Sequence, residues 1–270
     1  MSPQDVSKNR YTLIVEKLFF DNYSEGASSI EFTRDEIEAI AKRLKIKLPK
    51  NLGDIIYSFR YRSNLPASIL KKAPKGWEWI IRGTGRARYE FKLNRIVHVR
   101  PDPNRAETKI PDATPAIVVK YALNDEQSLL AKLRYNRLID IFLGITCYSL
   151  QSHLRTSVAS IGQVETDEMY VGVDRSGVHY IVPVQAKGRS DRIGVVQIEQ
   201  DCELCAAKYP ALVCKPVAAQ YVQEDLIAVF LFEMTVDGLR VSTERQYRLV
   251  AANELSEDEL KSYRDRLAND

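Results

Sequence analysis

The sequence GQVETDEMYVGVDRSGVHYIVPVQAKG, residues 162–188, decides how the C-terminal part of the chain folds. Hydrophobic and polar residues roughly alternate over residues 163–174, which is the period of a strand with one buried face. Residues 175–177 have turn chemistry, and residues 178–184 form a β-branched and aromatic run. The segment therefore predicts a β-hairpin.

The predicted hairpin carries charged and polar residues where a plain core hairpin has none. The two-residue period of a strand places Glu165 and Asp167 on one face of the first strand, and Gln185 and Lys187 on one face of the second. Oxygen ligands suit Mg²⁺, and a nearby lysine orients water and stabilises developing negative charge. This layout is the one that metal-assisted hydrolysis of a phosphodiester needs. The alternative is an exposed hairpin whose charges are only solvated.

ETDE at residues 165–168 and VQAKG at residues 184–188, with Gln185 eighteen residues after Asp167, resemble the PD-(D/E)XK nuclease superfamily. That superfamily has the fold of restriction endonucleases, resolvases and RecB-type nucleases. The resemblance covers roughly residues 124–235. It implies Mg²⁺ as cofactor, Asp167 as the first acid of the motif, Gln185 in the place of the second acid, and Lys187 as its lysine.

Gln185 departs from the family pattern, which has Asp or Glu at this position. Its amide oxygen still ligates a hard cation but carries no charge, so metal affinity falls unless another acid compensates. Glu165, on the same strand face as Asp167, is the first choice for that role. Glu126 is the second choice, on a helix expected from residue 124 to about 156 that Gly144 either bends or divides; a solvated glutamate is the alternative there.

The N-terminal part has the pattern helix, strand, helix, helix and hairpin. We expect helices over residues 10–21, from the Thr33–Glu36 capping box, and from Asn51 to about residue 62, with a hairpin turning at residues 83–85. This order resembles a winged-helix DNA-binding domain over roughly residues 8–95. The resemblance implies DNA contacts from the third helix and the wing, namely Arg60, Arg62, Arg82, Arg86 and Arg88. Many winged helices bind proteins instead.

Charge is distributed unequally along the chain. Residues 1–100 hold twenty Lys or Arg against eleven Asp or Glu, a net charge of +9, so the remaining residues carry −6 of the total +3. This segregation suggests that the N-terminal part meets a polyanion and that the acidic C-terminal part holds cations. Unequal but purely solvated surfaces are the alternative.

The rest of the chain completes an α/β fold. Residues 96–123 contain four prolines and are expected to be a linker, with a short strand over residues 117–121. After Lys187 we expect a loop, a helix over residues 193–209, strands over 212–220, 226–232 and 240–250, and a C-terminal helix that begins at Ser256. The predicted organisation is an N-terminal winged-helix-like domain (1–95), a linker (96–123), and a nuclease domain (124–270) with a restriction-endonuclease-like central mixed sheet flanked by helices.

Several other protein classes lack support in the sequence. No apolar run approaches the roughly 20 residues of a membrane helix, and no apolar segment near the N-terminus serves as a secretion signal, so we expect a cytoplasmic protein without membrane contact. The four cysteines are expected to be buried thiols rather than zinc ligands. The three histidines belong to no metal or triad pattern, and a Walker-type phosphate loop is absent. His179, Gln197 and Gln200 are candidate neighbours of the site, or ordinary surface residues.

The sequence thus predicts a Mg²⁺-dependent endonuclease of duplex DNA, most similar to type II restriction enzymes. A homodimer is implied by analogy with those enzymes. A repair or mobile-element nuclease of the same fold is the nearest alternative. The alternative from another class is a DNA-binding regulator in which Gln185 has removed catalysis.

Overall fold

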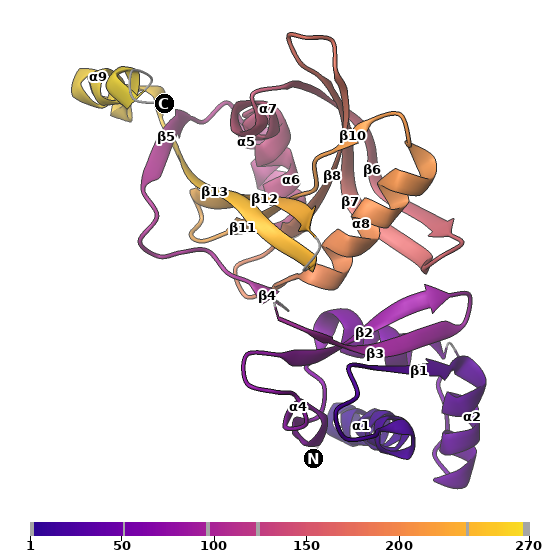
Figure 1. The fold of residues 1–270 in the computed structure, drawn as a ribbon. Coiled ribbons are helices and arrows are strands. Elements are labelled where there is room, and N and C mark those ends of the chain that lie inside the picture. The colour runs from indigo at the N-terminus through magenta and orange to yellow at the C-terminus, as the bar shows by residue number, and fades with distance from the viewer. Residues whose placement is uncertain (1–2, 51, 96–97, 123–124, 236–237, 267–270) are drawn as a thin grey trace. The chain divides into compact units, whose positions relative to one another are not determined.

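The computed structural model describes residues 3–50, 52–95, 98–122, 125–235 and 238–266 (Figure 1). The chain divides into two compact units. Unit one comprises residues 1–98, 155–164 and 194–204, and unit two comprises residues 99–154, 165–193 and 205–270. The chain therefore passes from one unit to the other five times, because neither unit is a single continuous stretch of sequence.

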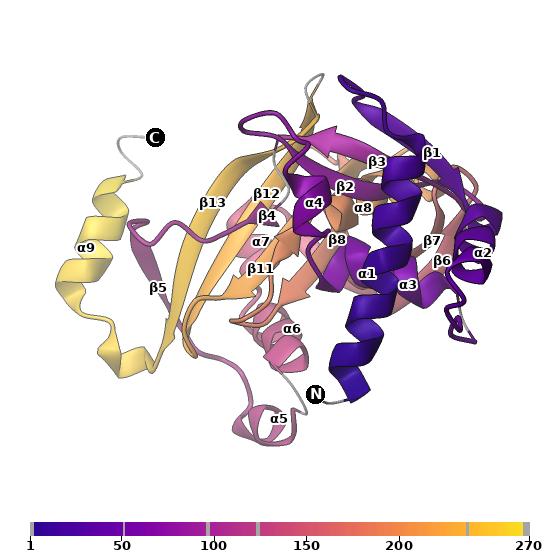
Figure 2. The ribbon, with the colours of Figure 1, turned by 90° about the horizontal axis from the view of Figure 1, so that it is seen from below.

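Unit one contains a small antiparallel sheet with helices on one side. Its strands are β1 (Ser29–Thr33), β2 (Glu78–Gly85) and β3 (Arg88–Asn94), in the order β1-β3-β2. Its helices are α1 (Pro3–Asn22), α2 (Arg34–Arg43), α3 (Gly53–Tyr57), which continues as a π-helix over Ser58–Arg62, and α4 (Ala67–Leu70). Figure 2 shows α1, α2 and α4 over one face of this sheet. Aromatic and aliphatic side chains such as Phe19, Trp79 and Phe91 fill the core between them.

The start of α2 agrees with the sequence prediction. The Thr33 hydroxyl accepts the Glu36 N–H, and a Glu36 carboxylate oxygen accepts the Thr33 N–H at 2.7 Å, which is the predicted capping box. The third helix also ends at Arg62 as expected, although its last turn is π-helical; Asn51, its expected first residue, lies outside the described residues. The order of elements is that of the prediction, and the winged-helix resemblance remains a prediction.

The β2–β3 turn differs from the prediction. Glycines at residues 83–85 were expected to form it, but β2 continues through Gly85 and the turn lies at Arg86 and Ala87. The pairing of β2 with β3 is irregular between Gly83 and Gly85, so these glycines accommodate a bulge rather than a turn. A Cβ atom on Gly83 would lie 2.5 Å from the carbonyl oxygen of Ile161, which explains why this position has no side chain.

Unit two is built on a large mixed sheet. Among the described residues the sheet has eight strands, in the order β5-β13-β12-β11-β8-β7-β6, with β10 also pairing with β8. The strands are β5 (Glu107–Pro111), β6 (Thr146–Val158), β7 (Gly162–Val173), β8 (His179–Lys187), β10 (Val213–Cys214), β11 (Val217–Tyr221), β12 (Leu226–Thr235) and β13 (Gly238–Val250). β8 is antiparallel to β7 and parallel to β11, so the predicted hairpin is confirmed, and it lies between β11 and the edge strand β6.

Helices flank this sheet. They are α5 (Ala116–Tyr121), α6 (Asp125–Tyr135), α7 (Leu138–Leu143) and α9 (Glu257–Arg266), with the 3₁₀ turn Ala252–Glu254. Leu129 and Leu133 of α6 pack in one hydrophobic core with Val184 and Ala186 of β8. α8 (Val195–Lys208) begins in unit one and ends in unit two, and β4 (His98–Val99) and β9 (Ile193–Gly194) are two-residue strands. The fold class, a mixed α/β protein with a large mixed sheet flanked by helices, is confirmed.

The long helix expected between residues 124 and 156 is wrong in its second half. The chain forms α6 and α7 and then, after Gly144, the strand β6. Gly144 has φ +66°, the left-handed conformation that ends a helix, so it terminates α7 rather than bending it. Residues 146–158 then extend as a strand rich in β-branched and polar residues.

The segment expected to be a linker contributes to the sheet of unit two. β5 pairs in parallel with β13, from Glu107 beside Gln246 to Pro111 beside Val250. The short strand expected over residues 117–121 is instead the helix α5, which begins directly after Pro115. Prolines at residues 101, 103, 111 and 115 therefore delimit short elements instead of marking an extended connection. In the part of the chain that the structure describes, no helix is long and apolar enough to cross a membrane.

Candidate functional site

The β7–β8 hairpin changes its pairing where the predicted site residues lie. Its backbone register runs from Val173 beside His179 to Glu168 beside Val184. Next to that end, the Asp167 carboxylate accepts the Ala186 N–H at 2.8 Å, and the Gln185 amide donates to the Glu165 carbonyl oxygen at 3.2 Å. Side chains thus take over hydrogen bonds between the two strands, and this fixes Asp167 and Gln185 in the sheet.

Lys187 lies between two carboxylates at the end of β8. Its Nζ is 3.8 Å from Oδ2 of Asp167 and 4.0 Å from Oε1 of Glu126. The side chains of Lys187 and Asp167 are 11% and 18% exposed, whereas that of Glu126, in the first turn of α6, is 46% exposed. Reduced solvent screening strengthens the attraction of the ammonium to both acids.

The pKa of Glu126 is raised above its ordinary value, mainly because the side chain is partly buried. The Lys187 ammonium opposes this shift, and the negative charges of Asp167 and Asp191 add to it. The Glu126 carboxylate is therefore under the influence of Lys187 and of two further acids.

Two side chains hold the loop after Lys187: Asp191, and Gln220, which the sequence analysis did not predict as part of the site. The Gly188 N–H donates to Oδ2 of Asp191 at 3.0 Å. Gln220 on β11 donates its amide N–H groups to the carbonyl oxygens of Gly188 and Asp191, at 3.2 and 2.8 Å. The signal in the sequence was a single amide inside the otherwise apolar strand VAAQY, because a polar residue there needs a reason for its burial.

The remaining predicted neighbours are placed as follows. Glu165 is half-buried, and its backbone oxygen accepts from Gln185; the acids within 4.0 Å of the Lys187 ammonium are Asp167 and Glu126. The second-choice acid thus lies at the site by distance. His179 is exposed at the opposite end of β8. Gln200 belongs to unit one, where its side-chain oxygen accepts the Tyr61 hydroxyl at 2.6 Å.

The donor atoms at the end of β8 are compatible with Mg²⁺. Among the described residues, no three His, Cys, Asp or Glu side chains form a group arranged to hold a metal ion. Mg²⁺, however, is usually held by one or two carboxylates and completes its shell with water and substrate phosphates. Asp167 and Glu126, with the neutral oxygen of Gln185, match that donor set. The four cysteines are free thiols; Cys147 and Cys205 are buried as predicted, whereas Cys202 and Cys214 are only half-buried.

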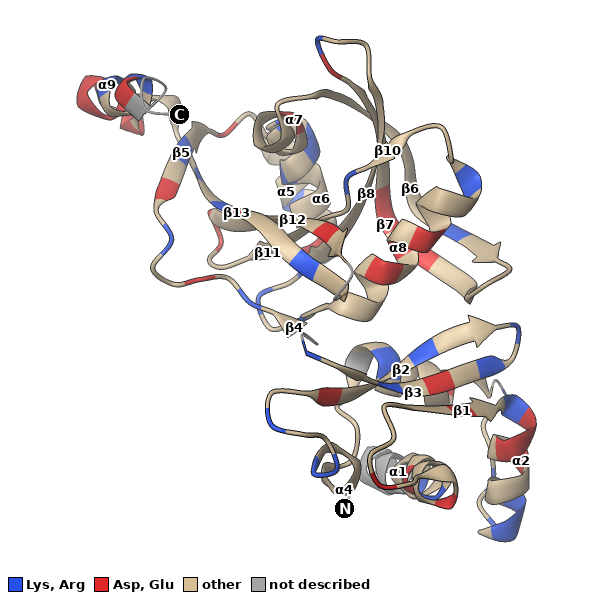
Figure 3. Cartoon of the chain, viewed as in Figure 1, with Lys and Arg blue, Asp and Glu red and all other residues tan. Residues whose placement is uncertain are grey.

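The arginines predicted to bind DNA have different environments. Arg82 is ion-paired with Glu199 inside unit one, so its charge is already compensated. The Arg60 guanidinium lies 5.0 Å from the centroid of the Tyr61 ring. Arg86 and Arg88 are exposed at the β2–β3 turn, where Figure 3 shows basic residues. The side chain of Arg62 lies outside the described residues.

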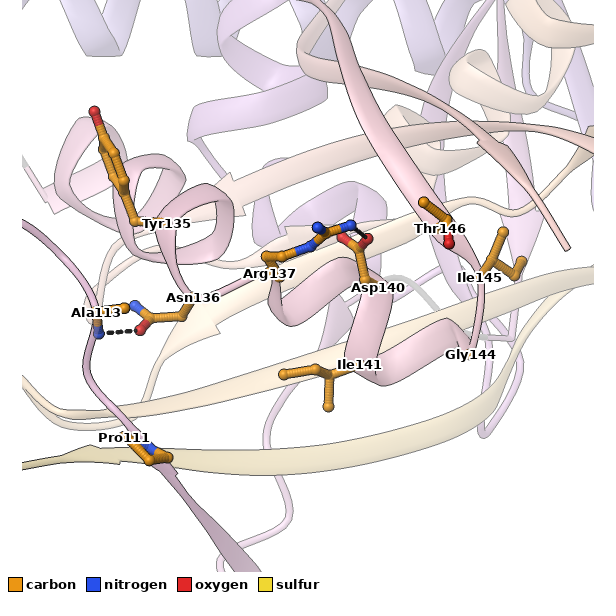
Figure 4. Close-up of a pocket in the computed structure, with 10 residues that line it drawn as sticks. All are labelled: Pro111, Ala113, Tyr135, Asn136, Arg137, Asp140, Ile141, Gly144, Ile145 and Thr146. Atoms are coloured by element: carbon orange, nitrogen blue, oxygen red, sulfur yellow. Dashed lines mark hydrogen bonds and ion pairs between the residues drawn. The ribbon is translucent and has the colours of Figure 1, made fainter. Parts of the chain in front are cut away.

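An open surface pocket with a volume of about 550 Å³ lies in another part of unit two. Figure 4 shows the residues that line it. Residues of α6, α7 and their neighbours line it, including Tyr135, Asn136, Arg137 and Ile141. Three of its polar side chains are engaged within the chain: Asn136 accepts the Ala113 N–H at 2.7 Å, and Arg137 is paired with Asp140. None of the predicted site residues lines this pocket, so the candidate chemistry is not located there.

Comparison with known proteins adds no assignment to this geometry. No family model, no curated protein and no solved structure matches the chain. The candidate site is therefore defined by its own residues: Lys187 with the carboxylates of Asp167 and Glu126, and the neighbouring amides of Gln185 and Gln220.

Proposed function

We propose that the protein is a Mg²⁺-dependent endonuclease of duplex DNA, similar in kind to type II restriction enzymes. The observation that supports this most is the largely buried Lys187 ammonium between Asp167 and Glu126. A lysine beside two acids at one sheet end is the minimal set for hydrolysing a phosphodiester with a divalent cation. Cutting of both strands by a twofold homodimer is part of the proposal, by analogy.

In this proposal the oxygen-bearing side chains and Lys187 have different roles in the hydrolysis. Asp167, Glu126 and Gln185 hold the cation, and Glu165 remains a further candidate. The oxygen of a water molecule bonds to phosphorus, one P–O ester bond breaks, the water gives up a proton, and the leaving oxygen takes one. Lys187 donates hydrogen bonds to the negative charge that develops on the phosphoryl oxygens. When bound, Mg²⁺ polarises the phosphate as a Lewis acid.

The cleavage assay is the direct test. Plasmid DNA is incubated with Mg²⁺ and the wild type, Asp167→Asn or Lys187→Ala, with Lys109→Ala as control, because Lys109 is paired with Glu259 elsewhere in unit two. We expect discrete fragments from the wild type and the control, and rates at least about 100-fold lower from the two site variants. Unchanged cleavage by Lys187→Ala would contradict the proposal. Unspecific products or a preference for branched DNA would indicate a repair nuclease of the same fold.

We propose that unit one, as a winged-helix-like module, binds the duplex, with its exposed hairpin turn reaching phosphates. The charge balance of residues 1–100 and the exposure of Arg86 and Arg88 support this. Replacing both arginines by Gln removes two positive side chains, so we expect weaker duplex binding. We also expect the slope of log K against log salt concentration to become shallower by about one unit for each phosphate contact that is lost.

Binding is measured as the dissociation constant at several salt concentrations with Ca²⁺ in place of Mg²⁺. Arg264→Gln, on the exposed helix α9, is the control and is expected to leave the slope unchanged. An identical slope for the hairpin variant and the wild type would remove these arginines from the DNA interface.

Gln185 favours a second candidate, a DNA-binding regulator without catalysis. Its buried amide carries no charge where the resembling nucleases have an acid. This candidate predicts duplex binding without cleavage in any divalent cation. The appearance of cleavage in Gln185→Glu, beside an inactive wild type, would identify it.

A further inference from the structure

Gln220 lies beside Lys187 on the neighbouring strand. β11 runs parallel to β8, and the register pairs Ala218 with Gln185 and Gln220 with Lys187. Residues paired across parallel strands project to the same face, and the strands are about 4.8 Å apart. Gln185, Lys187 and Gln220 therefore share one face at the end of the sheet.

The orientation of the Gln220 amide is fixed by its neighbours. Its nitrogen donates to two carbonyl oxygens, those of Gly188 and Asp191, and an oxygen in that position would face two acceptors. The amide oxygen Oε1 therefore occupies the other position. Gln220 is only 4% exposed, and no donor among the described residues lies within hydrogen-bonding distance of this oxygen.

A buried acceptor without a donor is costly, and a water or an ion that is not part of the chain can supply the missing partner. Acidic groups lie nearby: Asp191 accepts the Gly188 N–H in the loop that Gln220 holds, and Asp167 lies 3.8 Å from the ammonium of Lys187, the strand partner of Gln220. An oxygen acceptor among carboxylates faces a species that is positively charged or donates hydrogen bonds.

We propose that Gln220 is a cation-positioning residue of this site, with its Oε1 as a neutral oxygen that faces the hydrated divalent cation. This inference rests on the proposed function and extends it, because it adds a residue outside the ETDE and QAK segments. The two N–H donors of Gln220 hold the Gly188–Asp191 loop, and its oxygen faces the cation. One side chain thus couples the loop after Lys187 to the metal.

The test measures Mn²⁺ binding to the full chain without DNA, by titration calorimetry. Gln220→Met keeps the approximate volume and removes the oxygen, and we expect its Mn²⁺ affinity to fall by about 10-fold or more. Gln246→Met is the matched control, because Gln246 is also buried and its amide donates to the Asp102 carbonyl oxygen and to Glu244. We expect its affinity to remain within about twofold of wild type.

The outcomes separate this inference from the proposed function. If the wild type binds no Mn²⁺, or Asp167→Asn binds it as tightly as wild type, the proposed metal site itself fails. If binding depends on Asp167 but Gln220→Met stays within about twofold of wild type, only the role of Gln220 is overturned. Should Gln220→Met not fold, Gln220→Glu decides: affinity at least threefold tighter than wild type supports the role, and any smaller gain or a loss overturns it.

Discussion

At the scale of single residues, the charge of Glu126 lowers the stability of the metal-free fold, although the proposed cation site needs that charge. Its pKa is raised by partial burial and by the charges of Asp167 and Asp191. A carboxyl group whose pKa is higher in the folded state contributes most to stability below its unfolded pKa, and this contribution is lost as the pH rises through the folded pKa. At neutral pH the ionised Glu126 therefore destabilises the metal-free fold.

Glu126→Gln is accordingly expected to stabilise the metal-free protein at pH 7. The gain is at most about 1 kcal/mol, because the side chain is half-exposed and solvent screens it. We expect a melting temperature higher by no more than about 4 °C in EDTA at pH 7, a smaller difference near pH 4, and a smaller Mg²⁺-induced rise than in wild type. Differential scanning fluorimetry with Glu38→Gln, on an exposed part of α2, as control measures this. A lower melting temperature at pH 7 would show that the contact with Lys187 dominates.

The residues of the site were predictable to different degrees. Strand period alone identified Asp167, Gln185 and Lys187, because the hairpin is a local structure with a clear pattern. Glu126 was identified as a candidate but ranked below Glu165, since the sequence gives no distance between a helix and a strand. Gln220 lies 33 positions after Lys187, and only the parallel pairing of β11 with β8 brings the two together. Pairing between strands that are distant in the sequence produces no periodic pattern of residues, so it could not be predicted from the sequence.

At the scale of elements, an ion pair fixes α6 against β7. Glu168, the residue after Asp167, is fully buried, and Arg134 of α6 donates to both of its carboxylate oxygens, at 2.8 and 2.6 Å. Ser149 and Ser152 of β6 donate to the same carboxylate. Because α6 also carries Glu126 and β7 also carries Asp167, this cluster sets the relative position of the two acids.

Removing Arg134 should therefore be costly. We expect Arg134→Met to lower the free energy of unfolding by about 3 kcal/mol, because it leaves the Glu168 charge buried without its cation. The double variant with Glu168→Gln should lose less than the sum of the two single variants. Urea unfolding measures both. Arg137→Met is the control: its pair with Asp140 is largely exposed on the arginine side, so it should cost no more than about 1 kcal/mol. Equal costs would contradict a special role for Glu168.

Most elements were predicted because they carry local signals. The capping box at Thr33, the hairpin, and the strands of the C-terminal half follow from patterns within a few residues. The errors occurred where one local pattern suits two structures. Residues 146–156 have apolar residues at spacings that fit a helix, and the left-handed Gly144 ends the helix before them. Residues 117–119 are β-branched yet belong to α5, a short helix that begins directly after Pro115 and buries none of its residues, so packing does not account for it.

At the scale of the whole molecule, unit one contains more than the N-terminal domain of residues 1–95 that the sequence predicts. Residues 155–164 and 194–204 belong to it. They supply Glu199 to Arg82 and Gln200 to Tyr61, and the backbone of Ile161 closes over Gly83. Sequence patterns could not reveal these contributions, since they depend on contacts between residues more than 70 positions apart.

A fragment that ends at residue 98 should therefore fold poorly. It lacks the partners of Arg82 and Tyr61, and the surfaces that those segments cover become exposed. We expect a broad thermal transition by circular dichroism, at a lower temperature than that of the full chain. A sharp transition at the temperature of the full chain would show that residues 1–98 are self-sufficient.

Because the chain crosses between the two units five times, the codons of unit one do not form one continuous block in the gene. A single genetic crossover anywhere between the codons of residues 98 and 204 gives parts of unit one to two different parents. The exchange of unit one alone between two genes requires a crossover at each of the five boundaries. A single recombination event therefore cannot transfer unit one without part of unit two.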